Sequence, residues 1–345
     1  MAIKGCGSLL AAAVLAGIAA TGTGIDAQAT DADKVITAAR QALGGEGKID
    51  AVKTVSVVGR TTRTRPDGTS SESEFELSIE LPDKYMRRDV LAAMGPTSVY
   101  RNTGFNGDGL INLTDVPPSL SAGGNIRVAM IGPGSAPPGV TLTPEQKADL
   151  DKRTMAGFKQ EFTRLSLGMF ISSFKAYPIQ FKYGGQAESA DGKADILDVT
   201  GETGFTGRLF LDAATHLPLM FSWMDKEPLV MTVGGPGAGR GATMMGGGGG
   251  VQTFVQGGGG RSGGAPSKEE IEKMQQEMTD RMKEAEAKRQ TVEYRLFYAD
   301  YKTYDGVKLP TRIQQMVAGK ATQETTFDRV KVNGKIDPKK FEPTK

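Results

Sequence analysis

The segment Glu-Phe-Glu-Leu-Ser-Ile-Glu-Leu, residues 74–81, alternates acidic or polar side chains with apolar ones at every second position. Successive side chains of a β-strand point to opposite faces, so this period of two predicts a strand with one apolar and one charged face. Phe75, Leu77 and Ile79 form the apolar face. Such a strand is typical of an antiparallel sheet that has a core on one side and water on the other.

The same period recurs along the chain in further strand candidates, which are separated by short turns. They lie at residues 55–59, 85–90, 97–100, 110–113, 179–183, 194–200, 207–212, 217–224, 292–301, 308–317 and 322–332. Because most of the connections are too short for a crossover helix, neighbouring strands are expected to be antiparallel. In the candidate at 217–224, alternation puts Leu219, Phe221 and Trp223 on one apolar face.

Two amphipathic helices accompany these strands. Residues 30–44 place apolar side chains on one face and end at a Gly-Gly pair, which suits the left-handed end of a helix. A second helix begins after Thr143, and its apolar stripe consists of Phe158, Phe162, Leu165 and Met169. Both stripes are interpreted as core-facing. We therefore expect a mainly β protein with helices, in which helices cover the concave face of one strongly curved antiparallel sheet; a two-sheet sandwich is the alternative.

A glycine-rich segment interrupts the strands. Residues 234–264 contain 16 glycines among 31 positions, and ordering such a chain costs more backbone entropy than its burial returns. We predict a flexible insert at 234–266, followed by an amphipathic helix at 267–290, within a single domain over residues 30–345. The narrow apolar face of this helix carries the candidate partner-binding residues Met274, Met278 and Met282.

The first 29 residues match an export signal. Lys4 supplies a positive start, residues 9–20 are apolar, and Ala-Gln-Ala at 27–29 is a small-x-small cleavage motif. This pattern predicts a periplasmic protein cleaved near Ala29, with no transmembrane segment left. The alternatives are acylation of Cys6, which lies before the apolar run and not at its end, and an uncleaved anchor, for which the run is shorter than the roughly 20 residues needed.

Few residues are left for catalysis after cleavage, because the signal contains the only cysteine and one histidine remains. His216 falls in a turn near Asp212, and no nucleophile motif accompanies the pair. Residues 106–109, Asn-Gly-Asp-Gly, lack the spaced acids of a calcium loop. The 42 basic and 40 acidic residues are interleaved, without a basic stripe for nucleic acid. We predict no catalytic residue, no metal site, no cofactor and no nucleic-acid partner.

Several turn and strand-edge sequences resemble one known family. They are Ala-Leu-Gly-Gly at 42–45, Leu-Pro-Asp-Lys-Tyr at 81–85, Leu-Pro-Leu at 217–219, Asp-Gly-Val-Lys-Leu-Pro at 305–310 and Ile-Asp-Pro at 336–338. In these features the chain resembles the periplasmic lipoprotein-carrier superfamily, the LolA/LolB-like proteins related to outer-membrane lipoprotein sorting. The resemblance implies an unclosed antiparallel β-barrel with helices over an apolar cavity that takes acyl chains. The chain departs from the family pattern in its length and its glycine-rich insert.

These patterns together predict an exported, non-enzymatic protein that binds or carries a hydrophobic ligand, a lipid or a lipoprotein acyl chain. The predicted ligand-binding residues are Phe75, Leu77, Ile79, Leu219, Phe221 and Trp223. An ordinary filled core made of the same residues is the structural alternative. The functional alternatives are an envelope protein–protein interaction or sensing module that uses the methionine helix, and, ranked last, a hydrolase with an acid pair.

Overall fold

The computed structural model describes residues 25–65, 67–94, 97–115, 142–190, 192–233, 242–246 and 268–344. Twelve strands in these residues form one sheet in which every neighbouring pair is antiparallel. From edge to edge they are β5 (Gly109–Asp115), β4 (Thr97–Asn106), β3 (Lys84–Met94), β2 (Ser70–Glu80), β1 (Thr54–Thr64), β14 (Lys320–Val332), β13 (Val307–Val317), β12 (Thr291–Tyr304), β9 (Pro218–Lys226), β8 (Thr206–Asp212), β7 (Gly192–Gly201) and β6 (Ile179–Ser189). The edge strands β5 and β6 do not pair with each other, so the predicted unclosed antiparallel sheet is confirmed.

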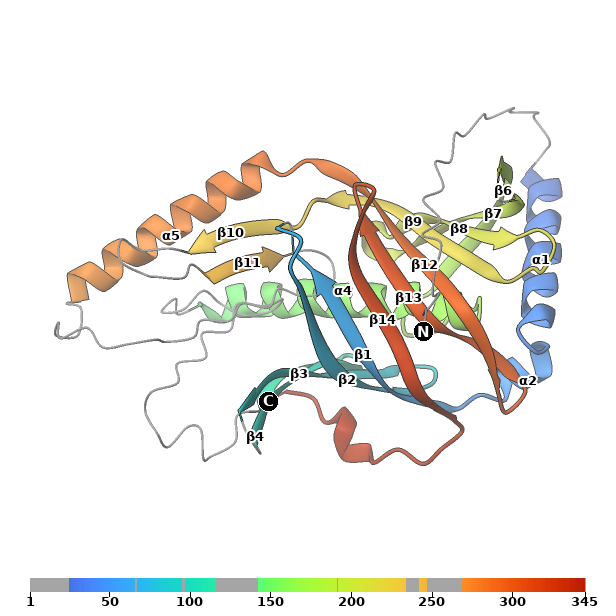
Figure 1. Cartoon of the computed structure of the whole chain (residues 1–345), viewed down its shortest axis with the longest axis horizontal. Coiled ribbons are helices and arrows are strands. Elements are labelled where there is room, and N and C mark those ends of the chain that lie inside the picture. Colours follow the sequence, from blue (N-terminus) through green and yellow to red (C-terminus); the bar gives the residue numbers. More distant parts are fainter. Residues whose placement is uncertain are drawn as a thin grey trace, which may run out of the picture.

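Three meanders make up this sheet: β1 to β5, β6 to β9, and β12 to β14. They are joined where β1 pairs with β14 and where β9 pairs with β12. Figure 1 shows the sheet curving around helix α4 (Pro144–Met169), with β2 and β3 below it and β6 to β9 above. The helix contacts β4, β9 and β13, so it lies against the concave face as predicted.

Helix α4 begins with a capping box. The Thr143 hydroxyl accepts a hydrogen bond from the Gln146 backbone N–H at 3.3 Å, and the Gln146 side chain accepts one from the Thr143 N–H at 2.9 Å. Its first turns are exposed, and continuous burial starts near Phe158. The helix is therefore amphipathic only along its second half, which is the part that covers the sheet.

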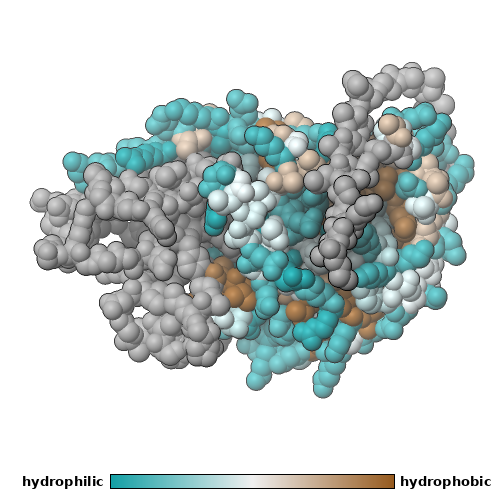
Figure 2. All heavy atoms as spheres, viewed as in Figure 1, coloured by the Kyte–Doolittle hydropathy of each residue, from teal (hydrophilic) through white to brown (hydrophobic). Residues whose placement is uncertain are grey.

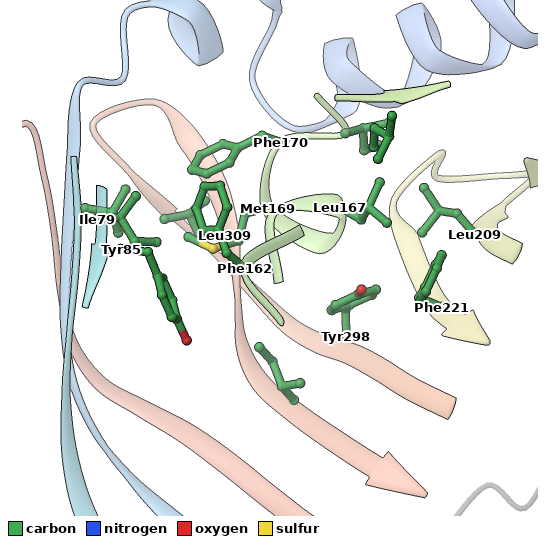
Figure 3. Packing of buried hydrophobic residues seen from close by; sticks show 14 of the residues in the cluster. Ile79, Tyr85, Phe162, Leu167, Met169, Phe170, Leu209, Phe221, Tyr298 and Leu309 are labelled. Atoms are coloured by element: carbon green, nitrogen blue, oxygen red, sulfur yellow. The ribbon is translucent and has the colours of Figure 1, made fainter. Parts of the chain in front are cut away.

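The centre of the core is Phe162 of α4. Its ring lies 5.6 Å from Tyr85, 5.7 Å from Phe105 and 5.6 Å from Phe174, measured between centroids. Figure 3 shows Tyr85 on one side of the helix and Phe221 on the other, with the helix residues between them. Aromatic pairs of this kind add about 0.5–1.5 kcal/mol to the stabilisation from area burial.

Two further helices lie at the start of the described chain. α1 (Ile25–Ala42) contacts the edge strand β6, and α2 (Glu46–Asp50) follows it. α1 begins at Ile25, earlier than the predicted residue 30. A Lys308 N–H donates to the Leu43 carbonyl at 2.7 Å and ties the end of this region to the sheet.

The chain leaves the sheet between β9 and β12. Here β10 (Leu229–Val233) and β11 (Ala242–Gly246) pair only with each other, and α5 (Lys268–Lys288) contacts β10 (Figure 1). Within the segment predicted to be a flexible insert, the structure thus describes one short strand. The rest of that segment lies outside the described residues.

Two glycines of α4 test how tightly the helix is packed. A Cβ on Gly168 would overlap the Tyr298 ring, whereas one on Gly157 would meet no atom within 4 Å. We expect Gly168→Ala to destabilise the protein by about 1–3 kcal/mol through overpacking. Gly157→Ala, the matched control, should stabilise it by up to roughly 1 kcal/mol through helix propensity. Urea unfolding of both variants measures the difference, and equal effects would contradict the close contact.

A deletion tests whether the excursion from the sheet is needed for folding. We propose that it is not, because the Glu227 N–H donates to the Gln290 carbonyl at 2.8 Å, where a hairpin turn would close the two strands. Replacing residues 228–289 by Asn-Gly, a favoured two-residue turn, should leave a cooperative unfolding transition. The lost ion pair of Lys226 with Glu286, at 3.2 Å, is exposed and worth little. Thermal unfolding followed by circular dichroism checks this, and an aggregated or non-cooperative variant would refute it.

Candidate ligand-binding cavity

A cavity of about 120 Å³ lies between α4 and the concave face of the sheet. The apolar part of its wall consists of Phe75, Leu77, Phe158, Leu165, Trp223, Leu296, Ile313 and Phe327. The charged part consists of Arg63, Arg87, Asp89, Arg101, Glu161 and Arg164. One space is therefore bordered by side chains that suit a hydrocarbon and by side chains that suit an ion.

Three of the six predicted ligand-binding residues line this cavity: Phe75, Leu77 and Trp223. Ile79 and Phe221 are fully buried in the surrounding core and are not part of the wall. The two predicted apolar faces thus meet under α4, although they are far apart in the sequence. A role of these residues in ligand binding stays a prediction.

Leu219 does not share the face of Phe221 and Trp223, and this part of the prediction is wrong. Its side chain is 39% exposed. The register of β8 and β9 shifts here, since Phe210 pairs with Met220 while Leu211 pairs with Pro218, leaving Leu219 as an extra residue. Such a β-bulge reverses the alternation of side chains between the two faces beyond it. Counting every second residue back from Trp223 assumes a regular strand and therefore misplaces Leu219.

The charged residues of the wall were not among the predicted site residues. Arg87 binds the Asp89 carboxylate through Nε, at 3.0 Å to each oxygen, and through Nη2 at 2.9 Å. Arg63 approaches the same carboxylate at 4.0 Å. The Tyr85 hydroxyl donates to Glu161 of α4 at 3.1 Å. A network of ionisable groups thus connects the sheet to the helix inside the cavity.

A signal for this network is present in the sequence. Strand β3 pairs Ile79 with Tyr85, Leu77 with Arg87 and Phe75 with Asp89. Side chains of directly paired residues point to the same face of a sheet, so Tyr85, Arg87 and Asp89 lie on the same face as the apolar side chains of β2. This face is the concave one, and Arg87 and Asp89 therefore point inward. The predicted strand at 85–90 contains this information, but only the pairing register shows which face is the concave one.

Arg164, in the C-terminal half of α4, and Trp223, in β9, both line the cavity. The guanidinium carbon of Arg164 lies 4.3 Å from a ring centroid of Trp223, a cation–π contact. Arg164 is 8% exposed and Trp223 is 7% exposed. Neither Arg164 Nε nor Trp223 Nε1 has a hydrogen-bond partner in the described structure. A buried donor without a partner costs about 1–3 kcal/mol.

Burial governs the protonation of these groups. It lowers the pKa of Arg164 and raises the pKa of Glu161 above its ordinary value, because a low-dielectric surrounding penalises the charged form. Burial also raises the pKa of Tyr85 well above its usual range. The acidic partner on α4 is therefore a weaker counter-charge than an exposed glutamate would be.

A second cavity of about 310 Å³ lies between α2 and the end of β2. Its wall includes Ile49, Leu81, Phe170 and Asp50. This aspartate is already paired with Arg40 at 2.5 Å, and the wall contains no arginine. The first cavity is the better candidate, because it alone of the two combines apolar walls with buried charge.

The pair of His216 and Asp212, weighed from the sequence as a base and its orienting acid, lies in a turn. His216 follows a tight turn, in which its N–H donates to the Asp212 carbonyl at 2.7 Å and Asp212 Oδ1 accepts the Thr215 N–H at 2.6 Å. Among the described residues, no cluster of three or more His, Cys, Asp or Glu side chains is arranged to hold a metal ion. The Asp212 carboxylate thus organises a turn.

The outer surfaces offer fewer features. Figure 2 shows a largely hydrophilic face with small hydrophobic patches, and the large apolar side chains exposed in the described chain are Leu113, Leu219 and Met224. Met274, Met278 and Met282 fall within α5, but their side chains lie outside the described residues, so a partner-binding role stays a prediction. No helix in the described part of the chain is long and apolar enough to cross a membrane.

The raised pKa of Glu161 leads to a pH-dependent stability. The folded protein holds this proton more tightly than the unfolded chain, so the contribution is complete below the ordinary glutamate pKa of roughly 4.3 and is lost as pH rises through the folded value. Glu161→Gln should therefore gain melting temperature relative to wild type between pH 4 and pH 8.

Glu145→Gln in the first turn of α4 is the matched control. A hydrogen bond from the backbone N–H of Glu145 lowers its pKa, so its small pH effect has the opposite sign. Thermal unfolding at several pH values measures both variants. A difference for Glu161→Gln that does not grow with pH would show that burial leaves this carboxyl unperturbed.

No family model matches the chain, and no curated protein does. Among solved structures it is similar to a LolA superfamily protein from Nitrosomonas europaea, at 10% sequence identity and a TM-score of 0.40. It is also similar to a DUF1329 family protein from Desulfovibrio piger, at 10% identity and a TM-score of 0.41. Both alignments cover 90% of this chain and 97% of the other.

Proposed function

We propose that this chain is an exported, non-enzymatic protein of the periplasm that binds or carries a hydrophobic ligand, a lipid or a lipoprotein acyl chain, under α4. The observation that supports this most directly is the cavity between that helix and the concave sheet, with apolar side chains on both walls. Burying a hydrocarbon there contributes roughly 0.8 kcal/mol per methylene and needs no catalytic group.

Admission of a ligand requires α4 to move. The cavity of about 120 Å³ is smaller than the roughly 300–1,000 Å³ of ordinary ligand pockets. The helix is anchored at its C-terminal half, where the Tyr298 hydroxyl donates to the Arg164 carbonyl at 2.5 Å and the Tyr301 hydroxyl donates to the Gly168 carbonyl at 2.9 Å. Its exposed N-terminal turns have no such anchor among the described contacts, so the helix can tilt about its C-terminal end to widen the cavity.

The only tryptophan of the chain, Trp223, reports on this space, because it lines the cavity wall. Bromine atoms on an acyl chain quench tryptophan fluorescence on contact. We expect saturable quenching of the purified exported protein by dibromostearoyl monoglyceride, an uncharged probe, below its aggregation concentration. The unbrominated monoglyceride should compete and restore the fluorescence.

A pair of identical substitutions makes this experiment specific. Leu165→Gln places an amide on the partly buried wall of the cavity, whereas Leu113→Gln changes a side chain that is 41% exposed on β5. Only Leu165→Gln should weaken binding of the monoglyceride, by about tenfold, because it replaces apolar contact surface with an amide. Absence of saturable quenching, or equal affinities in both variants, would overturn the proposed function.

A further inference from the structure

We infer that the ligand of this cavity is an amphiphile with an anionic head, a carboxylate or a phosphate, and that the arginines of the wall bind that head. The inference rests on the proposed binding of an acyl chain and adds the chemical class of the ligand. It comes from the charged part of the wall, which a purely apolar guest would leave unused.

Basic side chains outnumber acidic ones on this wall. Four arginines, Arg63, Arg87, Arg101 and Arg164, line the cavity with two acids, Asp89 and Glu161. Asp89 is held by Arg87 through both carboxylate oxygens. Glu161 is bonded by Tyr85, and burial favours its neutral form. Asp225, which does not line the cavity, is a further counter-charge to Arg164. Because a buried charge is costly unless it is paired and hydrogen-bonded, an anion bound next to these arginines would stabilise them.

Two buried donors identify where an anion is needed. Arg164 Nε and Trp223 Nε1 have no partner in the described structure, and both side chains are more than nine-tenths buried. The two side chains are in contact, with 4.3 Å between the guanidinium carbon and a ring centroid of the indole. Each group is only a donor, so an acceptor must complete it. Oxygen atoms of a carboxylate or phosphate supply several acceptors and make the stronger, charge-assisted bonds.

The apolar wall determines what accompanies the anion. Phe75, Leu77 and Ile313 line the same cavity as the arginines, and the guanidinium carbon of Arg87 lies 4.3 Å from the ring centroid of Phe75. A free inorganic anion would satisfy the donors but leave these side chains unused. An amphiphile engages both surfaces at once, with its head on Arg164 and its neighbours and its chain along the apolar wall.

The test compares three probes that share one brominated acyl chain. Dibromostearic acid has a carboxylate head, dibromostearoyl lysophosphatidic acid a phosphate head, and dibromostearoyl monoglyceride a neutral head. Quenching of Trp223 in the full exported protein should show that at least one anionic probe binds about tenfold or more tightly than the neutral probe. The tighter of the two anionic probes then distinguishes a fatty acid from a phosphate lipid as the source of the head.

Arg164→Gln should lower the affinity for the anionic probes about tenfold and change the affinity for the neutral probe less than twofold. Arg88→Gln is the matched control: Arg88 neighbours Arg87 on β3, but it pairs with Asp115 at 3.3 Å and does not line the cavity, so it should change none of the three. Arg164→Lys, which keeps the charge but not the planar donor set, should weaken anion binding less than the glutamine variant.

The outcomes separate this inference from the proposed function. Equal affinities for all three probes, or a uniform weakening by Arg164→Gln, would overturn the anionic head and leave acyl-chain binding intact. Failure of every probe to quench would overturn both. If Arg164→Gln does not fold, the wild-type affinities for charged and neutral heads still decide the question, and competition by inorganic phosphate alone would show that an anion binds without the chain.

Discussion

The docking of one helix against the concave face of the sheet is the contact on which the rest of the structure depends. Phe162 of α4 lies among Tyr85, Phe105 and Phe174, and two tyrosine hydroxyls of β12 hold the C-terminal half of the helix through its carbonyls. A sheet with unpaired edge strands has no closure of its own. The helix buries the aromatic residues of both sheet halves, which would otherwise face water.

The same docking produces the candidate site. It brings Glu161 and Arg164 from the helix to the arginines of β1, β3 and β4 and to Trp223 of β9. Because the helix covers the cavity only with its amphipathic second half, the space is neither filled like an ordinary core nor open like a surface groove. Most of the interior is filled by its own side chains, as the alternative of an ordinary core predicts. The charged cavity is the exception.

Much of the fold follows from local patterns. The alternation at residues 74–81, the short turns and the Thr143 cap predict β2, the antiparallel pairing and the start of α4, because each depends on neighbours in the sequence. The site follows less well. Leu219 leaves its predicted face through a bulge in β9, and Arg87 and Asp89 face inward through their pairing with β2. Both outcomes depend on the pairing register between neighbouring strands, which the sequence of one strand alone does not determine.

The sequence by itself determined the class of the molecule: one-sided antiparallel strands, covering helices and the absence of a recognisable catalytic motif. It did so because strand period, turn chemistry and helix capping are properties of adjacent residues. Only the tertiary structure decided which apolar face became a cavity wall and which charges were enclosed with it. Burial of Arg164 beside Trp223 joins residues 59 positions apart, and the cost of enclosing a charge arises only when distant segments exclude water from it.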